Sequence, residues 1–155
     1  MTPGSRVRLK YGHVVECKGA IKDFNGDISE VLAELIPDTK SGTPGSDSVK
    51  VKGVITWVAV ADAVQAEVRL YERLFKEAHP EGGGVDFLQN LNTDSLKVIT
   101  AYVEPSLASG GAIEAQADDK FQFERHGYFV ADRVDHAAGT PVFNLAVGLK
   151  DSWGK

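Results

Sequence analysis

Few side chains in this sequence could carry catalysis or bind a metal, and their spacing suits neither role. The single Cys17 cannot complete a zinc set, and no two histidines form an i, i+4 pair on a convincing helix. The segment 42–46 (GTPGS) lacks the Gly-Lys-Ser/Thr ending of a phosphate-binding loop. We therefore predict no catalytic residue and no metal site in this chain. The four histidines are His13, His79, His126 and His136.

Three acidic residues offer one other route to catalysis. Asp118, Asp119 and Glu124 could supply the paired carboxylates of a glycoside hydrolase. Nothing else in the sequence indicates a carboxylate-lined cleft, so solvated loop charges are the better interpretation. A β-sandwich hydrolase or sugar-binding protein is therefore the weakest of the functional hypotheses.

Two short stretches carry polar groups that could recognise an unpaired nucleic acid. Because side chains alternate along a strand, Arg6, Arg8 and Lys10 share one face. Gln122 and Glu124 share a face of another strand, where amide and carboxylate groups can hydrogen-bond base edges. The opposite face of that strand carries Phe121, Phe123 and Arg125. From the residues alone, exposed polar faces are the favoured interpretation of both stretches.

Aromatic side chains are a second feature that nucleic-acid binding could use, because unpaired bases stack on them. Most should fill the interior, since small β-barrels need large side chains inside. We expect only one or two to reach a nucleic acid. The aromatic residues considered are Trp57, Tyr71, Phe75, Tyr102, Phe121, Phe123, Tyr128, Phe129 and Phe143.

The charge balance argues against a protein that holds RNA mainly by its phosphates. The 155 residues carry 17 Lys+Arg and 22 Asp+Glu, a net charge of −5. Residues 1–80 hold 11 of each sign, whereas residues 81–155 hold 6 basic and 11 acidic residues. An RNA site must therefore be a local patch, or must read bases more than backbone. No apolar run approaches the ~20 residues of a membrane helix, so we expect a cytoplasmic protein that binds no membrane.

The elements that must position these groups are mostly strands, as apolar–polar alternation and β-branched residues indicate. Asn25-Gly26 between apolar flanks predicts a tight hairpin. The segment 37–48 is a polar loop, and Gly53 indicates a bulge or a close approach of two backbones. The predicted strands span residues 6–10, 13–18, 28–36, 49–58, 96–104, 121–125, 128–132 and 141–149.

Two stretches depart from this strand pattern. Residues 61–78 are rich in Ala, Glu and Leu, and local propensity favours a helix there. Residues 86–92 could form a short helix, with Asp86 near its start.

Several long motifs resemble, in the same order, the C-terminal anticodon-binding region of glutaminyl-tRNA synthetases. They span nearly the whole chain and run for up to ten residues, which makes the resemblance far more specific than a short pattern. The motifs are residues 49–58 (VKVKGVITWV), 66–75 (AEVRLYERLF), 102–107 (YVEPSL), 121–125 with 127–129 (FQFER and GYF), and 141–144 with 147–153 (PVFN and VGLKDSW).

The resemblance implies an all-β fold of two antiparallel β-barrels, similar to that of the ribosomal 5S-RNA-binding proteins. It implies that residues 1–95 form the distal anticodon-binding barrel and that residues 96–155 supply strands of the proximal barrel. It also implies extended structure at 66–75, against the local preference for helix. We expect the catalytic domain and the first proximal strands to lie outside this chain, which would leave a sheet edge open to strand swapping.

The resemblance also implies a function, which is to bind the anticodon of glutamine tRNA with its bases splayed into separate pockets. Arg8 and Lys10 match basic residues that approach the first anticodon base and its phosphate. Relatives can have arginine at position 10. Lys10 therefore offers a compact ammonium group where they offer a planar guanidinium group with several fixed donors. Gln122 and Arg125 match residues that line the pocket for the middle base, a uridine. The side-chain amide of Gln122 can both donate hydrogen bonds to the uracil edge and accept them from it. The family's segment for the third base is not found in this chain.

The reaction implied for the parent enzyme joins glutamine to its tRNA using ATP and Mg²⁺. This chain alone should be inactive and should bind no cofactor or DNA, because glutamine and ATP would be held by the catalytic domain. The alternative is a free-standing RNA-binding β-barrel of the ribosomal 5S-RNA-binding type. Departures from the family at Leu145, Ala146 and Lys150 leave the contacts of those positions undefined.

Overall fold

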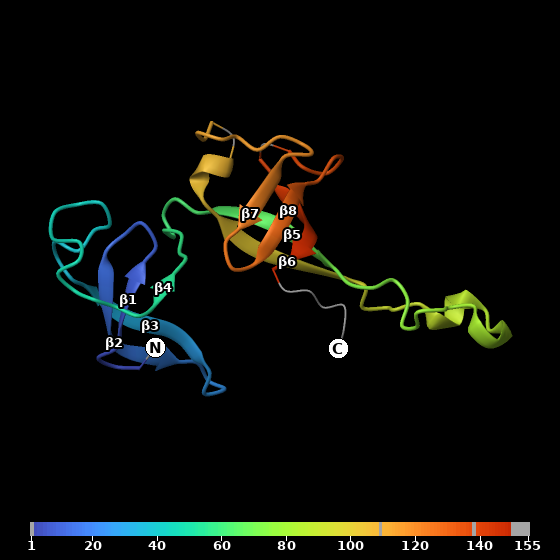
Figure 1. Ribbon diagram of the computed structural model, residues 1–155, viewed down its shortest axis with the longest axis horizontal. Coiled ribbons are helices and arrows are strands. Elements are labelled where there is room, and N and C mark those ends of the chain that lie inside the picture. The colour runs from blue at the N-terminus through green and yellow to red at the C-terminus, as the bar shows by residue number, and fades with distance from the viewer. Residues whose placement is uncertain (1, 109, 138, 150–155) are drawn as a thin grey trace. The chain divides into compact units, whose positions relative to one another are not determined.

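The computed structural model describes residues 2–108, 110–137 and 139–149, and within them it contains strands and three short 3-10 helices but no α-helix (Figure 1). This confirms the prediction of an all-β fold. The chain divides into two compact units, Met1–Trp57 and Val58–Lys155, which we call the N-terminal and the C-terminal unit. None of the helices in the described residues is long and apolar enough to cross a membrane.

The N-terminal unit is a four-stranded sheet with the order β3-β2-β1-β4. Strands β1, β2 and β3 follow one another as antiparallel hairpins, as the sequence predicts. The second hairpin turns at Gly26, whose φ of 88° is a conformation that glycine adopts without steric cost. The Asp23 carboxylate stabilises the turn by accepting hydrogen bonds from the N–H groups of Asn25 and Asp27 at 2.9 and 3.0 Å. The strands are β1 (Arg6–Leu9), β2 (Val14–Lys22), β3 (Ile28–Leu35) and β4 (Val54–Ile55).

The prediction of a long strand at 49–58 is wrong, because only Val54–Ile55 forms regular pairs, parallel to β1. The alternating sequence indicates an extended chain, but this segment lies at the sheet edge and reaches a single neighbour. The expected close approach at Gly53 is confirmed: a Cβ there would lie 3.3 Å from Cγ1 of Val7. The Gly53 carbonyl also accepts from the Arg8 backbone N–H at 3.0 Å.

The C-terminal unit is a five-stranded sheet with the order β6-β5-β9-β8-β7. Strands β5 and β9 are parallel, and the other neighbours are antiparallel. Both sheets are therefore mixed, so the expected purely antiparallel pairing is wrong; the long segments between paired strands leave room for the crossover that a parallel pair requires. The strands are β5 (Val64–Tyr71), β6 (Leu96–Val103), β7 (Lys120–Phe123), β8 (Gly127–Ala131) and β9 (Val142–Gly148).

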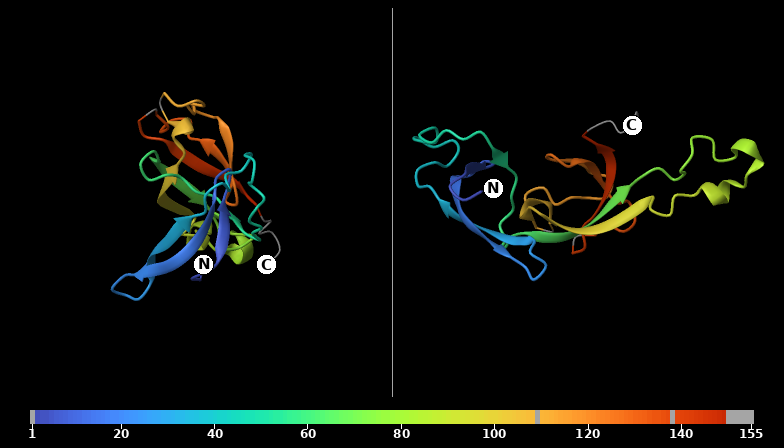
Figure 2. Two further views of the ribbon diagram at one scale, coloured as in Figure 1. Left: turned by 90° about the vertical axis from the view of Figure 1, so that its left-hand side faces the viewer. Right: turned by 90° about the horizontal axis from the view of Figure 1, so that it is seen from below.

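Strand β5 confirms extended structure over most of 66–75 and overrules the local helix preference. It pairs with β6 along its whole length, and the two continue into an arm, residues 72–95, that extends from their ends (Figures 1 and 2). The arm carries the short helices η1 (Gly82–Gly84) and η2 (Phe87–Asn90), and η2 begins where Asp86 accepts from the N–H of Leu88 at 3.0 Å. The third, η3, is Pro105–Leu107.

The division into two units differs from the boundary expected between residues 95 and 96. Residues 64–71 lie before that boundary, yet their strand pairs with β6 and β9 and so belongs to the C-terminal sheet. The sequence motifs gave no sign of this pairing, because it joins residues far apart in the chain.

Packing follows the alternation of side chains on the strands. In the C-terminal unit, Phe123 stacks on Phe129 with ring centroids 4.6 Å apart, and Phe121 and Phe143 meet edge to face at 5.8 Å. Of the nine aromatic residues considered, the four phenylalanines of β7, β8 and β9 lie in or against the core of that unit. Trp57, Tyr71, Tyr102 and Tyr128 are exposed, so more rings reach the surface than the sequence led us to expect. Cys17 is 1% exposed in the N-terminal unit.

Candidate nucleic-acid interface

The hairpin of β7 and β8 displays polar and aromatic groups on the face opposite the core. Phe121 and Phe123 of β7 pack inward, so Lys120 and Gln122 point outward. Gln122 lies directly opposite Tyr128 of β8, and both side chains are exposed. Together with Arg125 in the turn, we call Lys120, Gln122 and Tyr128 the hairpin patch.

Arg125 does not lie on the face of Phe121 and Phe123, contrary to the expectation from strand alternation. Strand β7 ends at Phe123, and Arg125 occupies the connecting turn with a φ of 67° and an exposed side chain. The turn is closed by a hydrogen bond from the His126 N–H to the Phe123 carbonyl at 2.9 Å. Its geometry brings Arg125 to the end of the hairpin that also carries Gln122.

Gly127 is required at the start of β8 for a steric reason. A Cβ at this position would lie 2.8 Å from both the Val147 carbonyl oxygen and Cδ1 of Leu145. The glycine thus lets β8 approach β9 closely where Gly127 pairs with Gly148.

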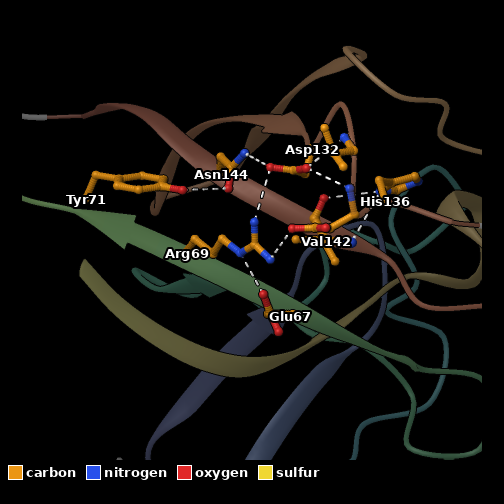
Figure 3. A network of polar contacts seen from close by, with 9 residues as sticks. Glu67, Arg69, Tyr71, Asp132, His136, Val142 and Asn144 are labelled. Atoms are coloured by element: carbon orange, nitrogen blue, oxygen red, sulfur yellow. Dashed lines mark hydrogen bonds and ion pairs between the residues drawn. The ribbon is translucent and has the colours of Figure 1, made fainter.

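A network of polar contacts braces the same outer face of the C-terminal sheet (Figure 3). The Arg69 guanidinium donates from Nε to Glu67 at 2.7 Å, and it contacts Asp132 through Nη1 at 3.3 Å and Asp135 through Nη2 at 2.7 Å. The carboxylates of Asp135 and Glu67 raise the pKa of Arg69 further above its already high value. Arg69 thereby ties strand β5 to the turn that follows β8.

Asp132 is the acceptor at the centre of this network. Its carboxylate accepts from the N–H groups of Asp135 at 2.8 Å and Val134 at 2.9 Å, and from Nδ2 of Asn144 at 2.6 Å. The bond from Asp135, followed by those from Asn144 and Val134, lowers the pKa of Asp132 from 3.8 to about 2. These bonds join β5, β9 and the turn after β8, so the network braces this part of the sheet.

His136 is a second fixed point next to this brace. Its Nε2 lies 2.9 Å from the Ala115 carbonyl, and its Nδ1 lies 3.3 Å from the Val142 backbone nitrogen. Nδ1 also lies 3.1 Å from the Val142 carbonyl oxygen, so the ring contacts the backbone of both Ala115 and Val142. His136 therefore anchors the beginning of β9. Within the described residues, no group of His, Cys, Asp and Glu side chains is placed to hold a metal ion.

The N-terminal unit brings the other two predicted residues together at the end of β1. Arg8 is partly buried, and its Nη1 and Nη2 donate to the carbonyl oxygens of Thr39 and Ser46 at 2.5 and 2.6 Å. Lys10 lies further along, with its Nζ 5.1 Å from the ring centroid of Tyr11. The two basic residues thus have different surroundings, and Arg8 is already engaged with loop 37–48.

Two exposed aromatic residues adjoin Lys10: Trp57 is among the aromatic residues considered from the sequence, and Tyr11 is not. Tyr11 is 76% exposed and Trp57 is 51% exposed, and Nε1 of Trp57 donates to the Lys10 carbonyl at 3.0 Å. We call Lys10, Tyr11 and Trp57 the strand-end patch. Only the tertiary structure separates these rings from the buried aromatics, because strand alternation does not say which face is covered.

The charges of the two units differ strongly. The N-terminal unit has 8 Lys+Arg and 7 Asp+Glu, whereas the C-terminal unit has 9 and 15. The N-terminal unit thus carries a net charge of +1 and the C-terminal unit a net charge of −6, which together give the −5 of the whole chain. Attraction of phosphates is expected mainly at the N-terminal unit, and base-edge contacts suit the hairpin patch better.

Comparison with known families gives a match over the middle of the chain, from β4 to the end of β8. Residues 54–132 match the family described as "tRNA synthetases class I (E and Q), anti-codon binding domain". This span is half of the chain and includes the whole β7–β8 hairpin with Gln122 and Arg125. The chain belongs to this family.

Similarity to curated relatives extends over nearly the whole chain. The glutamine–tRNA ligase of Cupriavidus taiwanensis is 63% identical over 99% of this chain, that of Ralstonia nicotianae 61% over 99%, and that of Bordetella avium 56% over 97%. The chain spans about a quarter of the length of these relatives, 25%, 26% and 25% respectively.

The sequence departs from the family at three positions, Leu145, Ala146 and Lys150. Leu145 packs against the core of this anticodon-binding domain, while Ala146 is exposed beside a register shift between β8 and β9. Lys150 lies outside the described residues. The structure places Arg8 on β1 and Lys10 in the turn directly after it, and it places Gln122 and Arg125 on one hairpin, each pair within its own unit.

Proposed function

We propose that this chain binds the anticodon loop of a glutamine tRNA, as part of a longer glutamine–tRNA ligase. The observation that carries the proposal is the hairpin patch: Gln122, Arg125 and Tyr128 are exposed together within the segment that matches an anticodon-binding family. An amide, a guanidinium and an aromatic ring are the groups that hydrogen-bond and stack an unpaired base.

Within this proposal, Gln122 and Arg125 read the middle base, a uridine. Gln122 both donates to and accepts from the uracil edge, and Arg125 supplies further donors from the turn. At the other unit, Lys10 and Arg8 approach the first base and its phosphate. Arg8 can serve there in addition to its carbonyl contacts, because a guanidinium has five N–H donors.

The names of the curated relatives support a role in a larger enzyme. We propose that the full-length protein attaches glutamine to its tRNA using ATP and Mg²⁺, in a catalytic domain that this chain does not include. We also propose that the two sheets belong to the distal and proximal β-barrels of the anticodon-binding region, resembling those of ribosomal 5S-RNA-binding proteins.

The proposal is tested by the affinity of this chain for an anticodon stem-loop of glutamine tRNA. We expect weak but measurable binding, since the segment for the third base is not found here, and a preference for uridine over cytidine at the middle position. Fluorescence anisotropy of labelled stem-loops measures both. Equal affinity for every middle base would contradict the assignment of the hairpin patch.

A further inference from the structure

We propose that Tyr11 and Trp57 form a stacking site for an unpaired nucleotide of RNA, with Lys10 beside its phosphate. This site would be separate from the hairpin patch, and it rests on the proposed RNA-binding function. Four observations on the N-terminal unit support it: the exposure of the rings, the backbone of Tyr11, the anchoring of Trp57 and the position of the cation.

The backbone of Tyr11 is strained for its residue type. The Gly12 N–H donates to the Leu9 carbonyl at 2.8 Å, which makes Tyr11 the third residue of a tight turn between β1 and β2. Its φ of 60° is the left-handed conformation that such turns normally assign to glycine or asparagine. Strained residues of this kind gather at binding sites. A large aromatic side chain that is 76% exposed at such a position gains little from folding.

Trp57 is exposed but held in place. Its Nε1 donates to the Lys10 carbonyl at 3.0 Å, and its ring lies against the turn, because a Cβ on Gly12 would be 3.5 Å from Cζ2 of Trp57. An anchored ring with an exposed surface is pre-organised for a flat ligand, since little conformational freedom is lost on binding.

The charge of the site selects a nucleotide rather than a neutral apolar partner. Lys10 Nζ lies 5.1 Å from the centroid of the Tyr11 ring, so a positive charge accompanies the aromatic surface. The N-terminal unit as a whole has one more basic than acidic residue, in contrast to the strongly acidic C-terminal unit. Aromatic rings beside a cation suit an unpaired base with its phosphate.

The test uses the intact 155-residue chain and the anticodon stem-loop RNA. Tyr11→Gly removes the ring and also relieves the backbone strain, so we expect the melting temperature to be kept or raised while affinity falls about tenfold, in the range for loss of one base–aromatic stack. Tyr11→Phe keeps the ring and should bind like the unmodified chain. RNA should quench Trp57 fluorescence, and Trp57→Phe, which leaves only Trp153, should remove most of that quenching.

The outcomes separate this inference from the proposed function. If Tyr11→Gly binds the stem-loop unchanged while Gln122→Ala weakens binding, the stacking site is wrong and the anticodon-binding function stands. If the unmodified chain binds no stem-loop at all, both are overturned. A Tyr11→Gly variant that loses affinity only in proportion to lost stability would also count against stacking.

Discussion

Arg8 donates from Nη2 to the carbonyl oxygen of Ser46 at 2.6 Å, which joins strand β1 to the far side of loop 37–48. Its Nη1 donates to the Thr39 carbonyl at 2.5 Å, and Thr39 in turn holds the Val14 N–H through its hydroxyl at 2.9 Å. The resemblance assigns Arg8 to RNA, yet in this structure it is also a clamp within its own unit. Its replacement should therefore affect folding as well as binding.

Arg8→Ala should lower the free energy of unfolding of the N-terminal unit by about 2 kcal/mol, because it leaves two partly buried carbonyls without their charged donor. Arg6→Ala is the matched control: Arg6 makes an exposed ion pair with Glu16, worth at most about 1 kcal/mol. Urea unfolding followed by the amide NMR signals of Val14 and Cys17 reports on this unit. Equal effects of the two substitutions would show that Arg8 is no clamp.

Gln122→Ala and Arg125→Ala should each weaken binding of the anticodon stem-loop, by roughly 1–3 kcal/mol for a lost base contact. Neither residue is buried, so the melting temperature should stay nearly constant. In the full-length ligase that we propose, the same substitutions should lower kcat/KM for the tRNA. Unchanged kinetics for both variants would remove these residues from the site.

Two exposed residues of the C-terminal sheet serve as controls for that experiment. Gln65→Ala removes an amide from β5, and Arg133→Ala removes a positive charge that pairs with Asp118 on the surface. We expect both variants to bind the stem-loop like the unmodified chain. A loss similar to that of Gln122→Ala would mean that net charge or general destabilisation explains the effect.

The low pKa of Asp132 predicts a window of acid sensitivity. A carboxylate whose pKa falls from 3.8 in the unfolded chain to about 2 in the folded chain stabilises the folded state above pH 3.8 and loses that contribution as the pH falls toward 2. The contribution is on the order of 2 kcal/mol. The Asp132→Asn variant should have a lower free energy of unfolding at pH 7 than the unmodified chain. Its free energy of unfolding should also fall less steeply between pH 4 and 2, as measured by urea unfolding. Parallel curves for both proteins would contradict this.

Gly127→Ala should destabilise the C-terminal unit by about 1–3 kcal/mol, because the new Cβ would clash with the Val147 carbonyl and Leu145. The matched control is Gly19→Ala, since a Cβ on Gly19 meets no atom within 4 Å. Thermal unfolding followed by circular dichroism should show a lower melting temperature for the first variant alone. If both variants melt alike, the close approach of β8 and β9 does not require glycine.

The sequence predicted most strands because local patterns set them. Alternation and β-branched residues located β1, β2, β3, β6 and β8, and the Asn25-Gly26 pair located the hairpin, since its positive φ favours those residues. The stretch 61–78 was ambiguous because its composition favours helix while its partners, β6 and β9, lie far away in sequence.

The sequence by itself determined the family and the all-β class, because long ordered motifs carry more information than charge or periodicity. Only the tertiary structure decided the parallel pairing of β5 with β9, the division after Trp57, and the different surroundings of Arg8 and Lys10. The physical reason is that these features depend on contacts between distant residues. Which aromatic rings are covered, and which carbonyls need a donor, is fixed only when the strands pack together.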